Sequence, residues 1–511
     1  MPSVDRRRLL IRAAALAAGA MAPAGWTTAW ARTRLPDNPF RLGVASGEPA
    51  PDGVVLWTRL AVDPAAPAGG MPPEPVEVGW EIAEDEALRR VVRRGRTIAA
   101  PEVGHSVHVE TGGLEPDRPY WYRFTAGGHA SPVARTRTAP RPGADVQRLR
   151  IAYGSCQKYE SGFYPAHAAL AADDPDLVVF LGDYIYEKAA TADGVRRHPE
   201  EDCLDLASYR RRYAWYKGDA DLQAAHACAP WMVMWDDHEV SNDYGNDQDR
   251  SDPDPADFLK RRAAAYQAYF ENMPLRAAQR PLGPDMRLYR ATDWGRLARL
   301  ALLDDRQYRG PRPCDAQSRG KFIPKACPER TDPARSMLGA DQEAWLQARL
   351  GDTPATWNLL GQQTLMMEIV TPDARVSNDG WDGYAQTRRR ILEGWRDAKT
   401  ANPVVLGGDV HCFFAADLAL EPGGKPIASE FVGGSIASLG RSKEIVRGML
   451  ALHPDLKFGD GDTRGYGRVD ITPEACRVTF RGVENALVKN SPVRDLAAFV
   501  VEAGEAGLKR A

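Results

Sequence analysis

The sequence has no surplus of basic residues. Lysine and arginine total 66 against 69 aspartates and glutamates, so the 511-residue chain has a formal net charge of −3. Four arginines and one aspartate lie in the first 31 residues, so without their +3 the remainder carries −6. A charge of this sign argues against a protein that binds nucleic acid through a general electrostatic attraction. We therefore expect no nucleic-acid-specific binding.

Long apolar runs and low-complexity tracts are also absent. Beyond the N-terminal region, no segment reaches about 18 uninterrupted apolar residues, so the sequence predicts no transmembrane span. Hydrophobic residues make up 43% of the chain and charged residues 26%, which is typical of a globular protein. The chain is longer than a typical single domain, so we expect two domains, one of them large.

Cysteine and histidine are scarce, with seven and nine residues. An odd number of cysteines cannot all pair, so at least one thiol has another fate. Cys314 and Cys327 bracket a polar loop that contains proline, and we predict a local disulfide between them. Cys203 and Cys228 are a second candidate pair. Disulfides would require an oxidising compartment.

The N-terminus has the pattern of an export signal. Arg6-Arg7-Arg8-Leu9-Leu10-Ile11-Arg12 precedes an alanine-rich apolar stretch, and Ala29-Trp30-Ala31 offers a cleavage site. Paired arginines followed by two aliphatic residues and a basic residue favour a twin-arginine signal over residues 1–31. An ordinary secretory leader and an uncleaved anchor are the alternatives. We expect the twin-arginine export machinery as a partner and a periplasmic or secreted location.

Residues 37–140 have the pattern of a β-sandwich. Short strand-like runs such as Val54–Trp57, Val76–Ile82 and His105–Val109 alternate with turns rich in proline and glycine. The stretch Leu114–Phe124 resembles the turn and strand of a fibronectin-III-like sandwich, with a tyrosine near the strand start. A linker-like stretch follows, so we predict an N-terminal β-sandwich domain.

Residues 148–511 have the pattern of a large α/β domain, in which strands alternate with helical segments. Short continuous apolar runs predict buried parallel strands. The composition of the closing segment, residues 493–509, predicts a helix. The predicted strands are Leu149–Gly154, Leu177–Leu181, Met232–Trp235, Leu297–Leu303, Trp357–Gln362 and Val404–Leu406, and a helix is predicted to start at Gly339.

Three of these apolar runs end in acidic and histidine residues. Asp183 follows the first, Asp236-Asp237-His238-Glu239 the second, and Asp409 with His411 the third. In an open α/β sheet, ligands collect beyond the carboxyl ends of the strands. Carboxylates and imidazoles gathered there favour metal chemistry on phosphate.

Three residues that follow predicted strands also have a structural interpretation. Asp183 can cap a helix, Tyr186 can be a core aromatic residue, and Cys156 can be a small buried hydrophobe. The run of three carboxylates is harder to explain without cations, because like charges repel. Asn242 adds a carbonyl oxygen that suits a hard cation, and Gly407-Gly408 permit close approach of backbone to a ligand. The combination favours a metal site.

With these motifs the chain resembles the PhoD-type alkaline phosphatase/phosphodiesterase family, which has the calcineurin-like metallophosphatase fold. The resemblance implies an αββα catalytic domain, preceded by the β-sandwich and the twin-arginine leader. The matching stretches are Tyr153-Gly154-Ser155-Cys156, Leu181-Gly182-Asp183-Tyr184-Ile185-Tyr186-Glu187, Trp235-Asp236-Asp237-His238-Glu239-Val240-Ser241-Asn242, Leu303-Asp304-Asp305-Arg306-Gln307-Tyr308-Arg309, Gly408-Asp409-Val410-His411 and Trp381-Asp382-Gly383-Tyr384.

The resemblance also implies a site with one Fe³⁺ and two Ca²⁺. Thiolate and phenolate stabilise a trivalent iron, whereas calcium prefers carboxylate and carbonyl oxygens. Carboxylate and imidazole alone would equally suit Zn²⁺ or Mn²⁺. A ligand role for Cys156 would account for the odd cysteine count. The implied iron ligands are Cys156, Asp183, Tyr186 and His411, with Asp183 bridging toward calcium, and the implied calcium ligands are Asn242, Asp409 and, as a further candidate, Asp237.

The implied activity is that of a secreted alkaline phosphatase that hydrolyses phosphate monoesters and diesters, small or polymeric, by metal-assisted phosphoryl transfer. Arg306 can clamp a phosphate oxygen or form a structural ion pair. His238 can protonate the leaving oxygen or orient a neighbouring ligand. Trp381 and Tyr384 can line the pocket mouth or pack structurally. The alternative functions are a phospholipase D-like phosphodiesterase and a catalytically inactive cell-surface binding protein.

Overall fold

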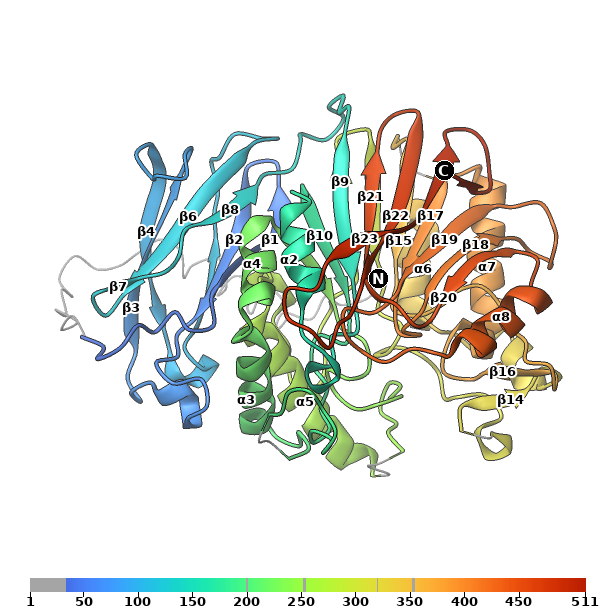
Figure 1. The fold of residues 1–511 in the computed structure, drawn as a ribbon, viewed down its shortest axis with the longest axis horizontal. Coiled ribbons are helices and arrows are strands. Elements are labelled where there is room, and N and C mark those ends of the chain that lie inside the picture. The colour runs from blue at the N-terminus through green and yellow to red at the C-terminus, as the bar shows by residue number, and fades with distance from the viewer. Residues whose placement is uncertain (1–33, 199–200, 251–253, 319, 352–353) are drawn as a thin grey trace, which may run out of the picture. The chain divides into compact units, whose positions relative to one another are not determined.

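Two large β-sheets dominate the structure, a computed structural model (Figure 1). It describes residues 34–198, 201–250, 254–318, 320–351 and 354–511, so the predicted leader at 1–31 lies outside the described residues. Contacts unite Leu35–Ala511 in one unit. None of the helices in the described ranges has the length and apolarity needed to cross a membrane.

The first sheet has ten strands in the order β24-β23-β22-β21-β9-β10-β11-β1-β2-β5. At its centre β9 (Leu149–Gly154), β10 (Leu177–Leu181) and β11 (Trp231–Met234) are parallel neighbours. Every residue of β10 and β11 is buried, because both faces of the sheet are covered. This explains the continuous apolar runs and confirms that they are parallel strands.

The second sheet has seven strands in the order β12-β13-β15-β17-β19-β18-β20. Four of them are parallel, namely β13 (Ala298–Leu302), β15 (Trp357–Gly361), β17 (Pro403–Gly407) and β19 (Ala428–Gly433). The remaining three are antiparallel to their neighbours and are β12 (Arg290–Trp294), β18 (Phe413–Leu418) and β20 (Leu456–Asp460).

The two sheets share one hydrophobic core, which contains Val178 and Val233 from the first and Leu302, Leu359 and Val404 from the second. Helices α6 and α7 contribute to a second core on the outer face of the seven-stranded sheet, and α2 contacts β21 and β22 of the ten-stranded sheet. The layers are therefore helix, sheet, sheet, helix, as the resemblance implied. The helices are α2 (Pro165–Ala172), α3 (Leu206–Lys217), α4 (Ala220–Cys228), α5 (Pro255–Asn272), α6 (Gly339–Leu350), α7 (Ala385–Ala398) and α8 (Lys443–Leu452).

The N-terminal strands form the predicted sandwich. A separate sheet of β4-β3-β6-β7, with β8 on β6, shares a core with β2 and β5. The Tyr120 hydroxyl accepts a hydrogen bond of 2.8 Å from the Glu115 backbone amide, as in a tyrosine corner. The strands are β1 (Val44–Ala50), β2 (Gly53–Arg59), β3 (Val76–Ala83), β4 (Val91–Ala99), β5 (Ser106–Glu110), β6 (Pro119–Ala126), β7 (His129–Ala130) and β8 (Ala134–Arg137).

The sandwich is not separate from the rest of the fold. Strands β1, β2 and β5 belong to the ten-stranded sheet, because β1 pairs in parallel with β11 at Gly47 and Trp231. One face of the sandwich therefore continues the sheet that carries the acidic clusters. The division into domains at 37–140 and 148–511 stays a prediction.

The predicted C-terminal helix is wrong. The segment forms β23 (Val493–Glu502) and β24 (Lys509–Arg510), which extend the ten-stranded sheet beyond β21 (Arg464–Ile471) and β22 (Ala475–Val483). Ala497, Phe499 and Val501 are buried at alternate positions, which is the period of a strand. Alanine and glutamate in this segment favour a helix by composition, but the alternation decides the structure.

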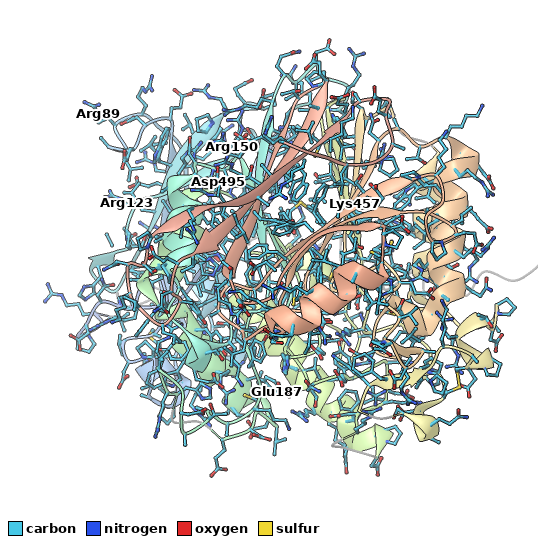
Figure 2. The ribbon with its side chains drawn as sticks, turned by 45° about the vertical axis from the view of Figure 1, so that its right-hand side comes forward. Arg89, Arg123, Arg150, Glu187, Lys457 and Asp495 are labelled. Atoms are coloured by element: carbon cyan, nitrogen blue, oxygen red, sulfur yellow. A yellow bond between two sulfur atoms is a disulfide. The ribbon has the colours of Figure 1, made fainter. Side chains whose placement is uncertain are left out.

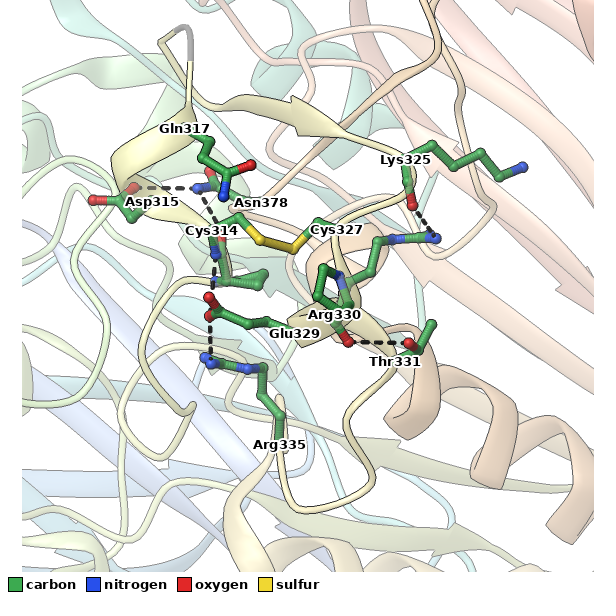
Figure 3. Close-up of a disulfide and its surroundings, with 12 residues drawn as sticks. Cys314, Asp315, Gln317, Lys325, Cys327, Glu329, Arg330, Thr331, Arg335 and Asn378 are labelled. Atoms are coloured by element: carbon green, nitrogen blue, oxygen red, sulfur yellow. Dashed lines mark hydrogen bonds and ion pairs between the residues drawn. A yellow bond between two sulfur atoms is a disulfide. The ribbon is translucent and has the colours of Figure 1, made fainter.

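The predicted disulfide between Cys314 and Cys327 is present, and the predicted Cys203–Cys228 pair is wrong, since both residues keep their thiols. The bond closes a loop that carries β14 (Phe322–Pro324), which pairs with β16 (Arg375–Ser377). Helix α8 lies at the front of the molecule in the view of Figure 2. The loop closed by the disulfide is drawn in Figure 3. There the Glu329 carboxylate accepts a hydrogen bond of 3.1 Å from the Cys314 amide.

Candidate metal centre

The loops that follow five parallel strands bring all nine predicted site residues into one cluster. Both sheets contribute, because their parallel strands end at the same edge. Cys156 follows β9, Asp183 and Tyr186 follow β10, and Asp237, His238 and Asn242 follow β11 of the first sheet, while Arg306 follows β13 and Asp409 and His411 follow β17 of the second.

The first group of donors contains sulfur, oxygen and nitrogen. One ligand atom each of Cys156, Asp183 and His411 lies within 4.8 Å of the others. The Tyr186 hydroxyl lies between them, donating to Asp183 Oδ2 at 2.7 Å and standing 3.1 Å from His411 Nε2. The other oxygen of Asp183, Oδ1, is buried and receives no hydrogen bond from the described residues. An orphaned buried carboxylate oxygen fits a metal ligand.

Burial opposes charge on these donors. It raises the pKa of the Cys156 thiol and the Tyr186 hydroxyl well above their ordinary values, and nearby Asp183 adds to both effects. Burial also raises the pKa of Asp183 to about 7. Thiolate and phenolate therefore form here only beside a strongly charged cation, which lowers the pKa of its ligands. The donor set fits a trivalent metal such as iron.

His411 has the tautomer that a metal ligand needs. Its Nδ1 lies 2.8 Å from the Leu439 carbonyl oxygen, which can only accept, so Nδ1 carries the proton. Nε2 is then left with a lone pair directed toward Tyr186 and Asp183. Burial lowers the pKa of His411 to about 4, which keeps the ring neutral. A backbone carbonyl that holds the second nitrogen is a common support for metal-binding histidine.

The second group of donors consists of carboxylates and one imidazole. Asp236, Asp237 and Asp409 form one set with ligand atoms within 4.8 Å, and Asp183, Asp237 and His238 form another. Asp183 and Asp237 thus connect the sulfur-containing group to an oxygen-rich one. Hard cations such as calcium prefer such ligands. The exposed Asn242 lines the cavity beside these carboxylates.

Arg306 holds the carboxylates together from behind. Its guanidinium donates two hydrogen bonds of 3.0 Å to Asp379 and a further one to Asp236, and it lies 3.8 Å from Asp237 and 3.6 Å from Asp409. The side chain is fully buried and does not line the cavity. The geometry favours the structural ion pair over the phosphate clamp.

The electrostatics of Asp237 follow from this arrangement. Burial acts to raise its pKa, but the Arg306 guanidinium and His238 outweigh burial and hold the pKa below its usual value. Asp237 also accepts hydrogen bonds from the backbone amides of His238, at 2.9 Å, and Asp243, at 2.6 Å. Asp237 is therefore an anion, ready to bind a cation.

His238 lies at the cavity wall with a carboxylate behind it. Its Nδ1 is 2.6 Å from Glu187, and its ring lies 4.1 Å from the Tyr186 ring, centroid to centroid. Burial alone would lower the pKa of His238, but Glu187 and Asp237 raise it well above the ordinary value. Glu187 also accepts the Asn242 backbone amide at 3.0 Å, so it connects two predicted site residues.

Four of the predicted ligands have left-handed backbone conformations. The φ angles are +59° at Cys156, +55° at Asp183, +57° at Asp409 and +55° at His411. A non-glycine residue in this region costs about 1–3 kcal/mol. Strain repeated at the ends of three strands indicates that the loops are held in shape for the donors they carry.

Sequence reasoning missed several charged residues of the site. Asp237, Asp243 and Asp379 form a further set with ligand atoms within 4.8 Å. Lys321, from the disulfide loop, lies 3.7 Å from Asp243 and 3.8 Å from Asp379. No pattern marks Asp379 or Lys321, because each lies in a loop that follows no predicted strand. The disulfide was the one available signal that the Lys321 loop is held in place.

Glu239 has a structural role instead of a place at the cavity. Its buried carboxylate accepts hydrogen bonds from the backbone amides of Asp183, at 3.1 Å, Asp236, at 2.8 Å, and Tyr184. It fixes the loop after β10 against the loop after β11. One of the three carboxylates in the acidic run is thus compensated by backbone amides.

The centre forms one end of a cavity with a volume of about 640 Å³. Among the residues that line it are Asp183, Asp237, Asn242, Asp409 and His411. Trp381 also lines it and donates a hydrogen bond of 2.9 Å to Gln362, whereas Tyr384 is buried and donates to the Gly310 carbonyl at 2.6 Å. Only Trp381 therefore fits a place in the pocket wall.

Two glycines let the loops approach one another. A Cβ at Gly408 would lie 2.5 Å from the Ser155 hydroxyl, so this glycine permits contact with protein and not, as the sequence indicated, with a ligand. Gly182 combines a φ of +99° with a neighbour, since an added Cβ would lie 2.4 Å from Asp236 Cβ. Both positions are therefore closed to larger residues.

Comparison with known proteins finds relatives along the chain. A family model described as PhoD-like phosphatase matches residues 151–480, and one described as PhoD-like phosphatase, N-terminal domain, matches residues 25–140. Alkaline phosphatase D of Bacillus subtilis (strain 168) is 42% identical over 486 residues, which cover 92% of this chain and 82% of that protein. A solved structure described as PhoD has a TM-score of 0.89 at 42% identity and covers 93% of each chain.

The contact at Gly182 predicts a specific defect. We expect Gly182→Ala to lower the melting temperature and the metal content, because its Cβ would push the loops after β10 and β11 apart. Gly128→Ala is the matched control, since φ is +93° but nothing lies within 4 Å of an added Cβ. Equal losses in the two variants, measured by thermal unfolding and elemental analysis, would mean that backbone strain alone matters at Gly182.

Proposed function

The chain belongs to the PhoD-like phosphatase family and is a hydrolase of phosphoric esters, and from this premise we propose that it is an exported, metal-dependent alkaline phosphatase acting on monoesters and diesters. The observation that carries the proposal is the set of overlapping donor groups at one end of the cavity. Sulfur, phenol, imidazole and carboxylate donors meet there, and a substrate can reach the carboxylate side.

For the metals we propose one Fe³⁺ and two Ca²⁺. Cys156, Asp183, Tyr186 and His411 would hold the iron, and Asn242, Asp237 and Asp409 would hold calcium together with Asp183. The anionic sulfur and phenol donors support iron over Zn²⁺ or Mn²⁺, which carboxylate and imidazole alone would equally suit. When bound, the cations supply Lewis acidity toward phosphate and neutralise charge that develops in the transition state.

The chain's own residues supply orientation and a proton. His238, held by Glu187 at the cavity wall, would donate a proton to the leaving oxygen of the ester. Arg306 would act as a positioning residue, because it contacts the carboxylates and not the cavity. Lys321, about one-third exposed at the edge of the centre, adds positive charge that favours an anionic substrate.

Export is part of the proposal. Residues 1–31 would serve as a twin-arginine signal that delivers the protein to the periplasm or the medium, where small or polymeric phosphoesters are its substrates. The sandwich at 37–140 and the domain at 148–511 would travel as one folded unit, because β1 pairs with β11. Fractionation of cells that express the full chain tests this location.

Two alternatives remain distinct. A phospholipase D-like phosphodiesterase would use the same centre, because the donors place no restriction on the ester group. An inactive cell-surface binding protein would have no use for four strained donor residues. We therefore favour the enzyme with monoester and diester activity.

The activity has a direct test. We expect the metal-loaded protein to hydrolyse p-nitrophenyl phosphate and bis(p-nitrophenyl) phosphate at alkaline pH, and a chelator to abolish both rates, because the carboxylates alone repel phosphate. The ratio of the two rates distinguishes monoester from diester preference, and release of the head-group alcohol from phosphatidylcholine would indicate the phospholipase. Hydrolysis of neither ester class would end the enzyme proposal.

The iron assignment predicts a difference between two buried cysteines. Thiolate and phenolate bound to Fe³⁺ give a visible charge-transfer absorption band, which we expect of the metal-loaded protein. Cys156→Ala should lose iron, activity and this band, because a thiolate donor is removed. Cys476→Ala should keep all three, since Cys476 is equally buried but lies on β22 away from the centre. Cys314→Ala should also keep iron. Equal iron content in wild type and Cys156→Ala, by elemental analysis, would refute the assignment.

Substitutions of His238 and Arg306 should have different effects on metal content and on the rates of the two ester classes. His238→Gln should retain metal but lose about 10²–10⁴-fold in rate on alkyl esters, and far less on nitrophenyl esters, whose leaving group needs no proton. Arg306→Gln should lose metal and slow both ester classes equally. A leaving-group dependence in Arg306→Gln, or none in His238→Gln, would reverse the two roles.

A further inference from the structure

The cavity has a second end that the metal centre does not use. Away from the candidate ligands its wall is mainly apolar, and it is formed by the segment after β15 on one side and by α8 on the other. The apolar residues of this end are Met367, Ile369, Val370, Ile445, Met449 and Leu452.

Helix α8 has more apolar surface than its packing requires. Val446 is buried in the core beside β18 and β20, which anchors the helix. Ile445, Met449 and Leu452 lie at positions i, i+4 and i+7, on one face of the helix, and of these three Met449 also packs against that core. Ile445 is 51% exposed and Leu452 is 49% exposed. A stripe of large apolar side chains that lines a cavity indicates an apolar ligand.

The apolar end is continuous with the metal centre. Val410, between the candidate ligands Asp409 and His411, lines the same cavity, as does Phe414 four residues later. One molecule can therefore contact the donors and α8 at once. The volume of about 640 Å³ falls within the usual range of about 300–1,000 Å³ for small-molecule sites and exceeds what a phosphate group fills.

Charge divides the cavity in the same way. The carboxylates of the predicted ligands and Lys321 lie at the metal end. Three charged residues line the rest of the wall: Asp382, whose carboxylate accepts a hydrogen bond of 3.1 Å from the Ile369 amide and pairs with Arg388, the half-buried Arg441 and the exposed Glu444. An anionic head would be bound at one end and an uncharged tail at the other. Helix α8 lies at the front of the molecule in Figure 2, and its cavity-lining residues Ile445 and Leu452 are exposed, so this end of the cavity is open to solvent.

We propose that the apolar end binds the alkyl ester group of an aliphatic phosphoester, with the phosphate at the metal end. This assignment rests on the proposed function and names its substrate class. In hydrolysis, the oxygen of water bonds to phosphorus and gives up a proton to the solvent, while the P–O bond to the leaving group breaks. The bonding electron pair goes to the leaving oxygen, which departs as the alcohol after protonation or as the free anion when it is nitrophenolate. The alkyl chain stays along α8 when it is the retained ester. The occupant is a single chain, not a membrane surface and not a second copy of the protein.

A homologous series of substrates tests the proposal. The probes are the methyl, butyl and octyl esters of p-nitrophenyl phosphate, below their aggregation concentrations, with metal-loaded full-length protein. Hydrolysis of each of the three esters releases nitrophenolate and leaves the alkyl phosphate, so one assay serves all three substrates. We expect KM to fall about two- to fourfold per added methylene that enters the apolar end, because burial of a methylene favours binding by up to that factor.

Gly448 offers a variant that fills the apolar end. It lines the cavity on α8, and an added Cβ would meet nothing within 4 Å, so Gly448→Leu extends into open space and also favours the helix. We expect it to cut the ratio of kcat/KM for octyl over methyl ester at least tenfold. Arg447→Leu is the matched control, one residue away and outside the lining, and should leave the ratio unchanged. Ile445→Ser, at an exposed position, should reduce the ratio without affecting the fold.

Binding supplies a readout that does not need turnover. Titration calorimetry with octylphosphonate should give tighter binding and a more negative heat capacity change than with methylphosphonate, and Gly448→Leu should remove the difference. Equal KM across the series, with the methyl ester still hydrolysed, would overturn the proposal and leave the proposed function intact. A chain-length effect only above the aggregation concentration would also overturn it, because a lipid surface would then be the ligand. Hydrolysis of none of the esters would instead refute the proposed function.

Discussion

A single buried guanidinium makes the rest of the site possible. Arg306 lies against Asp236, Asp237, Asp379 and Asp409, four carboxylates that would otherwise repel one another. Burying an ion pair is expensive, and the cost is offset only where several partners share the charge. Nη2 of Arg306 has no hydrogen-bond partner among the described residues, although Asp237 and Asp409 lie within 4 Å of it. The cluster is thus partly neutralised and still attractive to cations.

The fold brings these charges together by ending strands at one edge. Continuous apolar strands of both sheets place their loops side by side, and left-handed turns direct the donors inward. Glu239 holds the first two loops together through backbone amides, and Gly408 lets the loop after β17 meet Ser155. Rigid strands and closely packed loops thus fix donors that lie far apart in sequence, and the side chains need little adjustment when a cation binds.

The sequence predicted the structure well where a regular hydrophobic pattern was followed directly by residues with a clear chemical role. Buried parallel strands are apolar throughout, and the donors follow them directly, so both could be predicted together with the Cys314–Cys327 bond. Asp379 and Lys321 could not be predicted, because charged residues in loops are usually solvated. The role of Glu239 was also hidden, since a carboxylate that caps amides looks the same in sequence as one that binds metal. The last long strand was predicted as a helix because the helix-favouring composition of residues 493–509 was given more weight than the alternation of apolar residues.

The parallel pairing of β1 with β11 has a consequence for synthesis on the ribosome. Gly47 finds its partner Trp231 only after more than two hundred residues have been made, so one sheet of the sandwich lacks its neighbour until then. Contacts so distant in sequence slow folding and leave strand edges exposed in the meantime. The backbone groups along one edge of β11 in turn need β1, a strand from the beginning of the chain, as their pairing partner. The N-terminal strands therefore complete the ten-stranded sheet, and a shortened chain that begins after residue 140 would leave one edge of β11 unpaired beside the candidate metal centre.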